Sequence, residues 1–295
     1  MRFGLAALAV LGAALISALA HPATLSISEW RLITMIGYVA VGYVAVAALG
    51  EEAIVQGSVL AGWALLPVII VAANVGLLWE NRNIIAVFPV ILAPTGLIGA
   101  IPGGDPARTG EGKSPNKRLL WLALAITAEI SLGSAGGMLA MVVCLVVTFQ
   151  RSLWRLLFPG LGLAAIFAIA RPESTAWRLE YWRVAWDAFL SSPIVGVGPG
   201  SYASLWPVGQ AWYHAHNIVI TTAAETGLIG IAALEFAWLK LLNLTRRHPG
   251  AWQTAVIAGL LAHSLVDEPL QFWGPGLAFV AAAATLDVQA TRESA

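Results

Sequence analysis

The sequence predicts an all-α fold: a polytopic transmembrane helix bundle of about ten spans with one long extracytoplasmic loop. The composition is 59% hydrophobic and only 11% charged, whereas about a quarter of the residues in a soluble domain are charged. Apolar runs of roughly 20 residues, the length that crosses a bilayer, recur from one end of the chain to the other. Residues 1–295 are therefore interpreted as a single integral membrane domain.

Hydropathy places the individual spans in chain order. We expect them at residues 3–20, 32–50, 58–78, 84–101, 119–133, 135–150, 156–170, 216–242, 251–268 and 271–288. Prolines inside several spans predict kinks, which a bundle tolerates when neighbouring helices satisfy the freed backbone groups. Residues 1–20 could instead be a signal peptide that is cleaved after Ala20, but an immediate second span favours a first transmembrane helix.

The basic residues predict which side of the membrane each loop faces. With the N-terminus in the cytoplasm, 11 of the 16 basic residues lie on the cytoplasmic side and 5 outside, as the positive-inside rule requires. We therefore expect a multi-pass protein of the inner (cytoplasmic) membrane with both termini cytoplasmic. The extracytoplasmic loop, residues 171–215, would face the periplasm or exterior and carry part of the active site.

The outward loop has two distinct parts. Residues Ser174–Pro193 are rich in aromatic side chains at helical spacing, which predicts an amphipathic helix lying at the membrane interface. The following "PIVGVGPGSY" (Pro193–Tyr202) has three glycines at alternate positions, which indicates a turn leading back to the membrane. A phosphate cradle is an alternative here, although a glycine-rich turn without a preceding strand is weak evidence for one.

Polar and ionisable groups at membrane depth are candidates for function because they are costly to bury. The predicted topology gathers several of them on the outer side, among them Arg82, Asn83, Arg178, Arg183, His214, His216, Asn217, Glu225, His263, Asp267 and Glu268. Arginine presents a planar fork that suits phosphate oxygens, and histidine serves as a general base near neutral pH. This set suits a phosphorylated, anionic substrate and an acceptor hydroxyl.

Several candidates also have a structural explanation. Arg178 and Arg183 could contact lipid headgroups, and Glu225 could cap or bridge helices. The residues His263 and Asp267, four apart, could form a structural pair, while His214 could be a solvated loop residue. A zinc site built from histidines has weak support from an H-x-H pair alone, so no metal and no cofactor are predicted.

Charge and cysteine content exclude other classes of site. The formal net charge is zero, which gives no indication of nucleic-acid binding. The single cysteine, Cys144, excludes an internal disulfide and a cysteine metal cluster.

These motifs resemble the signature region of the O-antigen ligase and O-antigen polymerase superfamily. The resemblance rests on an arginine-bearing, tryptophan-rich outer helix, "SSPIVGVGPGSY", "HAHNIVITTAAETGLIG" and "HSLVD", and more weakly on "ENRNIIAVFPVIL". It covers residues 171–268 strongly and 80–150 weakly. One departure is Ala135, which stands where many members carry an arginine; that charge is absent here or supplied by Arg82.

The resemblance implies a metal-independent glycosyltransferase at the outer face of the membrane. The donor would be a glycan on undecaprenyl pyrophosphate, and the acceptor a sugar hydroxyl on lipid A core or on another glycan. His216 would accept the hydroxyl proton while Asn217 and Asp267 orient it. The remaining candidates would bind substrate: Arg178, Arg82, Arg183, Asn83, His214, His263 and Glu225.

Alternatives to this function come from the same family and from other classes. A polysaccharide polymerase of the same superfamily would use the same residues on a lipid-linked acceptor. A membrane transporter would place its site near the midplane, often between two repeats, and no internal repeat is visible in the sequence. A non-catalytic binder of lipid-linked glycans is the third alternative.

Overall fold

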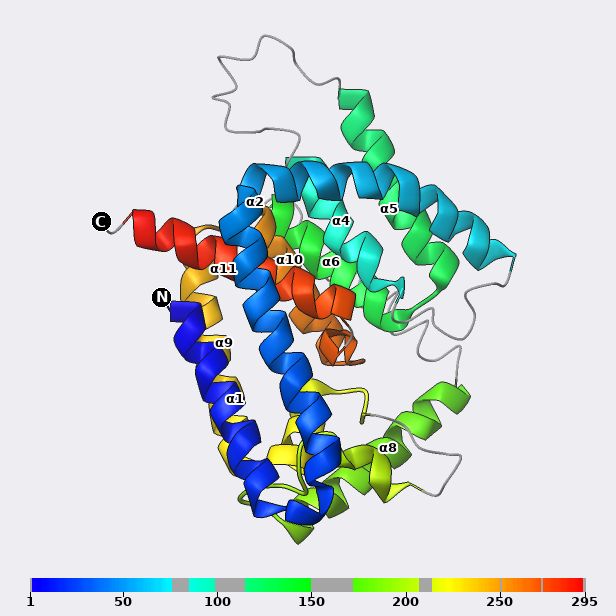
Figure 1. The fold of residues 1–295 in the computed structure, drawn as a ribbon. Helices are drawn as coiled ribbons and strands as arrows, with labels where there is room; N and C mark the ends of the chain where they lie inside the picture. The colour runs from blue at the N-terminus through cyan, green and yellow to red at the C-terminus, as the bar shows by residue number, and fades with distance from the viewer. Residues whose placement is uncertain are drawn as a thin grey trace.

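The computed structural model describes residues 2–75, 85–98, 115–149, 172–206, 214–249, 251–271 and 273–293, and these residues form helices and connecting turns without any strand (Figure 1). The α-helices are α1 (Arg2–Ala20), α2 (Leu25–Asn74), α4 (Val87–Ile98), α5 (Pro115–Leu132), α6 (Ala135–Phe149), α8 (Pro172–Ser191), α9 (Ile218–Arg247), α10 (Trp252–Ser264) and α11 (Trp273–Arg292). Short 3₁₀ turns are η1 (Pro22–Thr24), η4 (Ser201–Leu205) and η5 (Pro269–Gln271). The predicted all-α class is confirmed.

Within the described residues, four helical stretches are long and apolar enough to cross a membrane. They are Phe3–Ala20, Arg31–Gly50, Gln56–Asn74 and Ile218–Arg247, and the shorter Leu119–Leu132 and Ala135–Phe149 are also apolar. The predicted span 156–170 lies outside the described residues. The total of about ten spans and the orientation of the termini therefore stay predictions.

The second and third predicted spans join into one long element. Helix α2 changes direction at Gly50, whose φ of 72° and ψ of 165° interrupt the helical backbone (Figure 1). The first half packs beside α1 and α11, and the element also contacts α4 and α5. A positive φ is readily adopted only by glycine, so Gly50 lets two apolar helices meet without an intervening loop.

Helix α1 packs along α9 through a face of small residues (Figure 1). Ala6, Ala13, Ala14 and Ala18 are all buried on α1, and side chains this small let two membrane helices approach closely. The Ser17 hydroxyl on the same face donates a 2.7 Å hydrogen bond to the backbone carbonyl of Glu225. The first helix is thus attached to the part of α9 that carries the candidate residues.

A second apolar core joins α4, α5, α6 and α10. Trp121 on α5 is almost fully buried there and its indole Nε1–H donates to the Leu92 carbonyl at 3.0 Å. That bond satisfies the polar end of a large apolar side chain. This core supports the inner side of α10, whose far end carries His263 and leads to Asp267.

Helix α9 is interrupted at Gly227, which has a φ of 61° and a ψ of −156°. The glycine-rich turn after α8 lies against this break and exchanges four backbone hydrogen bonds with it. Val197 and Gly198 donate to the carbonyls of Ala224 and Glu225 at 2.9 and 3.0 Å, while Leu228 and Ile229 donate to Pro193 and Ile194 at 2.9 and 3.2 Å. The span predicted at 216–242 corresponds to the candidate span Ile218–Arg247. The structure adds that its helix is broken at Gly227 and that a second segment pairs with the backbone groups at the break.

Two glycines make this backbone pairing possible. A Cβ on Gly196 would collide with the backbone of Glu225 and Thr226, and a Cβ on Gly227 would lie 2.5 Å from the backbone of Ile194. Both residues also have positive φ angles. The spacing of glycines in "PIVGVGPG" and "ETGLIG" is thus explained by close contact between two backbones. Amides of Val197 and Gly198 are used in this contact, which removes them from any phosphate cradle.

Replacing Gly196 by alanine tests the pairing. We expect Gly196→Ala to lower the thermal unfolding temperature of the detergent-solubilised protein, because a left-handed backbone alone costs a non-glycine residue about 1–2 kcal/mol and the added Cβ displaces the Glu225 backbone. The matched control is Gly12→Ala, where a Cβ meets nothing within 4 Å and where alanine is the better helix former. Equal unfolding temperatures for the two variants would contradict this account.

Candidate active site

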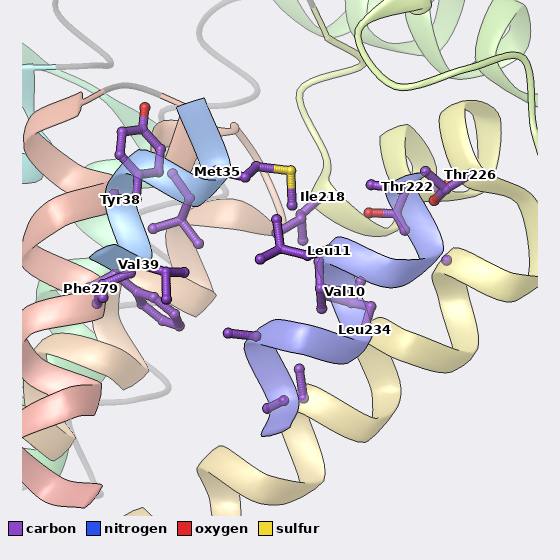
Figure 2. A pocket seen from close by; sticks show the side chains of 18 of the residues that line it. Val10, Leu11, Met35, Tyr38, Val39, Ile218, Thr222, Thr226, Leu234 and Phe279 are labelled. Carbon is purple, nitrogen blue, oxygen red and sulfur yellow. The ribbon is translucent and has the colours of Figure 1, made fainter. Parts of the chain in front are cut away.

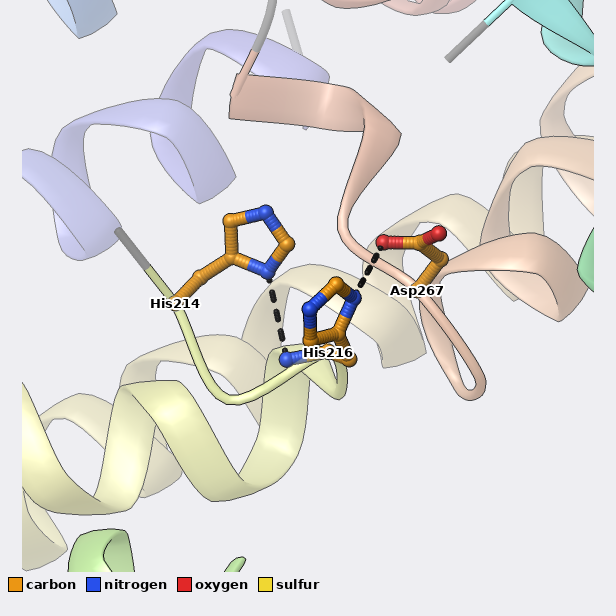
Figure 3. A group of neighbouring side chains, drawn as sticks. All are labelled: His214, His216 and Asp267. Carbon is orange, nitrogen blue, oxygen red and sulfur yellow. Dashed lines mark hydrogen bonds and ion pairs between the residues drawn. The ribbon is translucent and has the colours of Figure 1, made fainter. Parts of the chain in front are cut away.

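The structure brings His214, His216 and Asp267 together from two separate elements (Figure 3). The histidines precede α9, and Asp267 follows the end of α10. The His216 Nδ1 and Asp267 Oδ1 atoms are 2.9 Å apart. The backbone N–H of His216 donates to His214 Nδ1 at 3.2 Å. Imidazole and carboxylate side chains 51 positions apart in the chain thus form one buried group.

His216 has an uncommon backbone conformation. Its φ of 55° is the one positive φ of a non-glycine residue in the described segments, and such angles at functional sites persist only where surrounding contacts hold them. Three contacts do so here: the bonds to His214 and Asp267, and a parallel stack on the Tyr181 ring at 5.3 Å between centroids. Asp267 and Tyr181 thus hold the imidazole, while His214 holds the backbone of His216.

Asn217 connects the two elements that carry the histidine and the aspartate. Its side-chain oxygen caps α9 by accepting from the backbone N–H groups of Val219 and Ile220 at 2.9 and 3.1 Å, which satisfies donors that every helix start leaves free. Its amide donates to the Leu265 carbonyl at 2.8 Å. Asn217 thus positions His216 opposite Asp267. This placement is compatible with the orienting role predicted for Asn217.

Asp267 is almost fully buried and is held as an anion. Burial by itself would raise the pKa of this carboxyl, but the hydrogen bond from His216 and the neighbouring histidines lower the pKa well below its usual range. Its Oδ1 also accepts from the Glu268 backbone N–H at 2.8 Å. An anion fixed beside Nδ1 of His216 favours the tautomer in which that nitrogen carries the proton and Nε2 carries the lone pair.

His214 is buried, with 7% of its surface exposed, and is not the solvated loop residue considered as an alternative. Burial, followed by the charges of His216 and Arg31, lowers its pKa to about 3 even though Asp267 acts in the opposite direction. A neutral imidazole fits its contacts, since Nδ1 accepts the backbone N–H of His216. His214 therefore supports the conformation of its neighbour.

A short polar chain extends from His214 into α9. Glu268 Oε2 lies 3.5 Å from His214 Nδ1 and accepts the Thr221 hydroxyl hydrogen at 2.8 Å. Thr221 in turn accepts the Ala215 backbone N–H at 3.0 Å. The Glu225 carboxylate, one turn further along α9, is buried and lies within hydrogen-bonding reach of the backbone N–H groups of Gly200 and Tyr202. Glu225 thus holds the glycine-rich turn, in line with the bridging role expected as its structural alternative.

The two arginines on α8 differ in their surroundings. Arg178 is partly buried and interacts electrostatically with Tyr181 and His263. Arg183 is exposed, and its guanidinium pairs with Glu180 at 2.6 Å and Asp187 at 3.2 Å on its own helix. The structure brings Arg178 to the site and leaves Arg183 among exposed carboxylates.

The remaining candidates are placed as follows. His263 is fully buried at the end of α10 against α6, where a Cβ on Gly136 would lie 2.7 Å from its ring. It has an electrostatic interaction with Asp267, but the Asp267 carboxylate hydrogen-bonds His216 instead. Arg82 and Asn83 lie outside the described residues.

The sequence assigned no role in the site to three of its residues: Tyr181, Glu268 and Arg31. Tyr181 carries no signal beyond its place on the apolar side of the predicted interfacial helix. Glu268 adjoins Asp267, and Arg31 stands at the outer start of a predicted span, so polarity at a span end was the signal for both. Burial raises the pKa of Tyr181 to about 12, partly offset by Arg178, so its phenol stays neutral beside His216.

His214, His216 and Asp267 are residue types that commonly bind a metal ion. One ligand atom from each of His214, His216 and Asp267 falls within 4.8 Å of the others. The lone pair of His214 Nδ1, however, already accepts a backbone N–H, and His216 Nδ1 is bonded to Asp267. A metal bound through either Nδ1 atom would have to displace its hydrogen bond, and the metal-independent site stays our prediction.

The low pKa of His214 predicts acid sensitivity. An unfolded histidine binds a proton below about pH 6.5, whereas the folded one stays neutral to about pH 3, so stability is present above pH 6.5 and is lost as the pH falls between these values. Linkage puts the loss between pH 7 and pH 5 at roughly 2 kcal/mol. Thermal unfolding measured against pH should show a smaller decline in His214→Asn, which retains an acceptor without a titrating group. Parallel profiles for the two proteins would contradict a buried neutral His214.

Comparison with known proteins agrees with this geometry. Residues 119–234 match the family described as O-antigen ligase. The match spans α5, α6, α8 and the first half of α9, and includes Arg178, His214, His216, Asn217 and Glu225. No curated protein matches the chain. The match at residues 119–234 supports the resemblance to the O-antigen ligase superfamily that the motifs predict.

Proposed function

We propose that this protein is an O-antigen ligase-type glycosyltransferase at the outer face of the cytoplasmic membrane. It would transfer a glycan from undecaprenyl pyrophosphate to a sugar hydroxyl. The observation that carries the proposal is the 2.9 Å contact between His216 and Asp267, inside a bundle otherwise composed mainly of apolar side chains. Buried titratable pairs of this kind cluster at functional sites because they tune proton affinity.

His216 is the proposed general base. With Nδ1 donating to Asp267, Nε2 accepts the proton of the acceptor hydroxyl as its oxygen attacks the anomeric carbon. The bond between that carbon and the pyrophosphate oxygen breaks, and undecaprenyl pyrophosphate leaves with the electron pair. Asp267 stabilises the imidazolium that forms. Direct displacement would invert the anomeric configuration.

Arginines would neutralise the leaving pyrophosphate. Arg178 is the best supported, because it is partly buried and lies near Tyr181 and His263. A fixed cation where negative charge develops lowers the barrier to departure. Arg82 and Asn83 keep their proposed substrate-binding roles from the sequence, whereas the exposed pairing of Arg183 supports a smaller contribution.

The acceptor distinguishes the two reactions open to this site. A ligase would use lipid A core or another surface glycan, and a polymerase of the same superfamily would use a second lipid-linked glycan. The same base and the same donor site serve both. A transporter or a simple binder of lipid-linked glycans would not need a base held by an anion, so the His216–Asp267 pair favours transfer.

His216→Ala tests the catalytic base. We expect transfer of glycan from the lipid-linked donor to fall by about 10²–10⁴-fold, the usual contribution of a general base, while the protein stays folded in the membrane. His248→Ala is the control, because His248 caps the opposite end of α9. The assay follows acceptor glycosylation by purified protein in proteoliposomes. Undiminished transfer by His216→Ala would remove this residue from the mechanism.

Arg178→Ala tests donor binding. Losing a charge-assisted contact to phosphate should raise the KM for the lipid-linked donor by about tenfold or more. Arg246→Ala at the other end of α9 removes an exposed arginine without touching the site and should leave the KM unchanged. An unaltered KM in Arg178→Ala would assign this residue to the membrane surface instead.

A further inference from the structure

Three planar side chains form a row that leads from the proposed base to the protein surface. The His216 imidazole stacks on the Tyr181 ring, with 5.3 Å between centroids and 25° between planes. Tyr181 stacks in turn on Trp177, one helical turn earlier in α8, at 6.2 Å and 24°. Tyr181 is buried, but Trp177 is 54% exposed. An uncovered indole therefore lies two ring contacts away from the imidazole.

Trp177 is on the side of α8 that packs against the protein. The residues that follow it at helical spacing on this side, Tyr181, Ala185 and Ala188, are all buried, and α8 packs against α9. Trp177 continues the same side toward the start of the helix, where its ring stays exposed. A large aromatic ring that is left uncovered beside a candidate site is typical of a ligand-binding surface.

The opposite side of α8 carries the apolar residues suited to a membrane surface. Leu179, Trp186 and Leu190 are each more than half exposed, and their spacing of seven and four positions puts them on one side of the helix. Trp186 comes about two and a half turns after Trp177 and so lies on the far side from it. These three residues suffice for the contact with the membrane interface predicted for this helix, and Trp177 points elsewhere.

An exposed indole near a polar site suits a sugar ring. One face of a pyranose presents C–H groups with partial positive charge, and the face of an aromatic ring is negative. The two therefore attract each other, while the hydroxyls at the rim of the sugar stay in water. An indole also has few rotatable bonds, so holding it against a ligand costs little conformational entropy.

The cavity between α1, α2, α9 and α11, about 250 Å³ in volume, suits a glycan less well (Figure 2). Its wall is mainly apolar, with Val10, Leu11 and Phe279 among the side chains around it. A glycan carries hydroxyls on most of its ring carbons, and a hydroxyl that is buried without a partner costs free energy. A surface that combines an aromatic face with access to water is the better place for a sugar.

We propose that Trp177 binds a pyranose ring of the acceptor glycan by stacking against it. This inference rests on the proposed function, because the acceptor is the glycan whose hydroxyl must reach Nε2 of His216. The row of rings starts at that imidazole, so a glycan that presents its hydroxyl there has its next sugars beside α8. Trp177 would then set the direction of the acceptor chain, while the neighbouring Arg178 binds the donor.

Transfer kinetics in proteoliposomes test this role. The lipid-linked donor is held constant while the acceptor is varied, first as purified lipid A core and then as a second lipid-linked glycan, and whichever is used gives the acceptor KM. Trp177→Ala should raise that KM by about tenfold, as expected for one lost aromatic stacking contact. The kcat and the KM for the donor should stay close to the wild-type values, because neither His216 nor Arg178 is changed.

Trp186→Ala is the matched control. Trp186 is 56% exposed and packs against another aromatic ring, Phe189, at 5.2 Å, but it is on the far side of α8, so the acceptor KM should not change. Two variants at position 177 separate ring stacking from apolar bulk: Trp177→Phe should recover most of the acceptor affinity, and Trp177→Leu should not.

Three results would overturn the proposal. Equal effects of Trp177→Ala and Trp186→Ala would show a contact with the membrane. A lower kcat with an unchanged acceptor KM would show that Trp177 only supports Tyr181 and His216. A raised KM for the donor alone would place the donor, and not the acceptor, on this ring.

Saccharide binding separates this inference from the proposed function. The detergent-solubilised protein is titrated by calorimetry with two lipid-free probes, the core oligosaccharide and the glycan repeat unit. Binding of either probe that is lost in Trp177→Ala and kept in Trp186→Ala, in a protein that transfers no glycan, would support the inference and reject the function. Transfer that depends on His216, with kinetics and saccharide binding unchanged in Trp177→Ala, would reject the inference and keep the glycosyltransferase.

Discussion

The backbone pairing between Pro193–Gly198 and the break in α9 is the constraint on which the rest of the site depends. A helix interrupted inside an apolar bundle leaves donors and acceptors that lipid cannot satisfy. Here the glycine-rich turn satisfies four of them. Because a polar backbone group without a partner is costly in this environment, the turn and the helix are held in one register. That register therefore sets the positions of α8, which precedes the turn, and of the start of α9.

The candidate catalytic group follows from this register. The turn fixes α8 against the start of α9, which places Tyr181 beside His216. Asn217 then ties the start of α9 to the end of α10 and so brings Asp267 to the imidazole. Each contact is a polar group satisfied in a low-dielectric setting, where hydrogen bonds are stronger and unpaired groups costlier. The network that satisfies these buried groups also holds His216, the proposed base, in one orientation.

Charged groups of both signs lie around the His216–Asp267 pair. Asp267 is the anion held closest to the imidazole, and His214 remains neutral because burial disfavours its charged form. The cations near the site, Arg178 and Arg31, come from α8 and α2, which both precede the glycine-rich turn in sequence.

Local sequence determined the helical membrane class, most helix positions and the residues worth examining. Hydropathy, glycine positions and polar residues can each be read from a few neighbouring positions in the chain. His216, Asn217 and Arg178 could be selected in this way. Only tertiary structure decided that α9 breaks at Gly227, that Asp267 serves His216 when His263 is nearer in sequence, and that Tyr181 stacks on His216. Those outcomes depend on contacts between segments that are far apart in the chain. The separation is 51 residues for His216 and Asp267 and 208 residues for Ser17 and Glu225. The sequence pattern shows which groups are polar, but it does not show which of them come into contact in the folded protein.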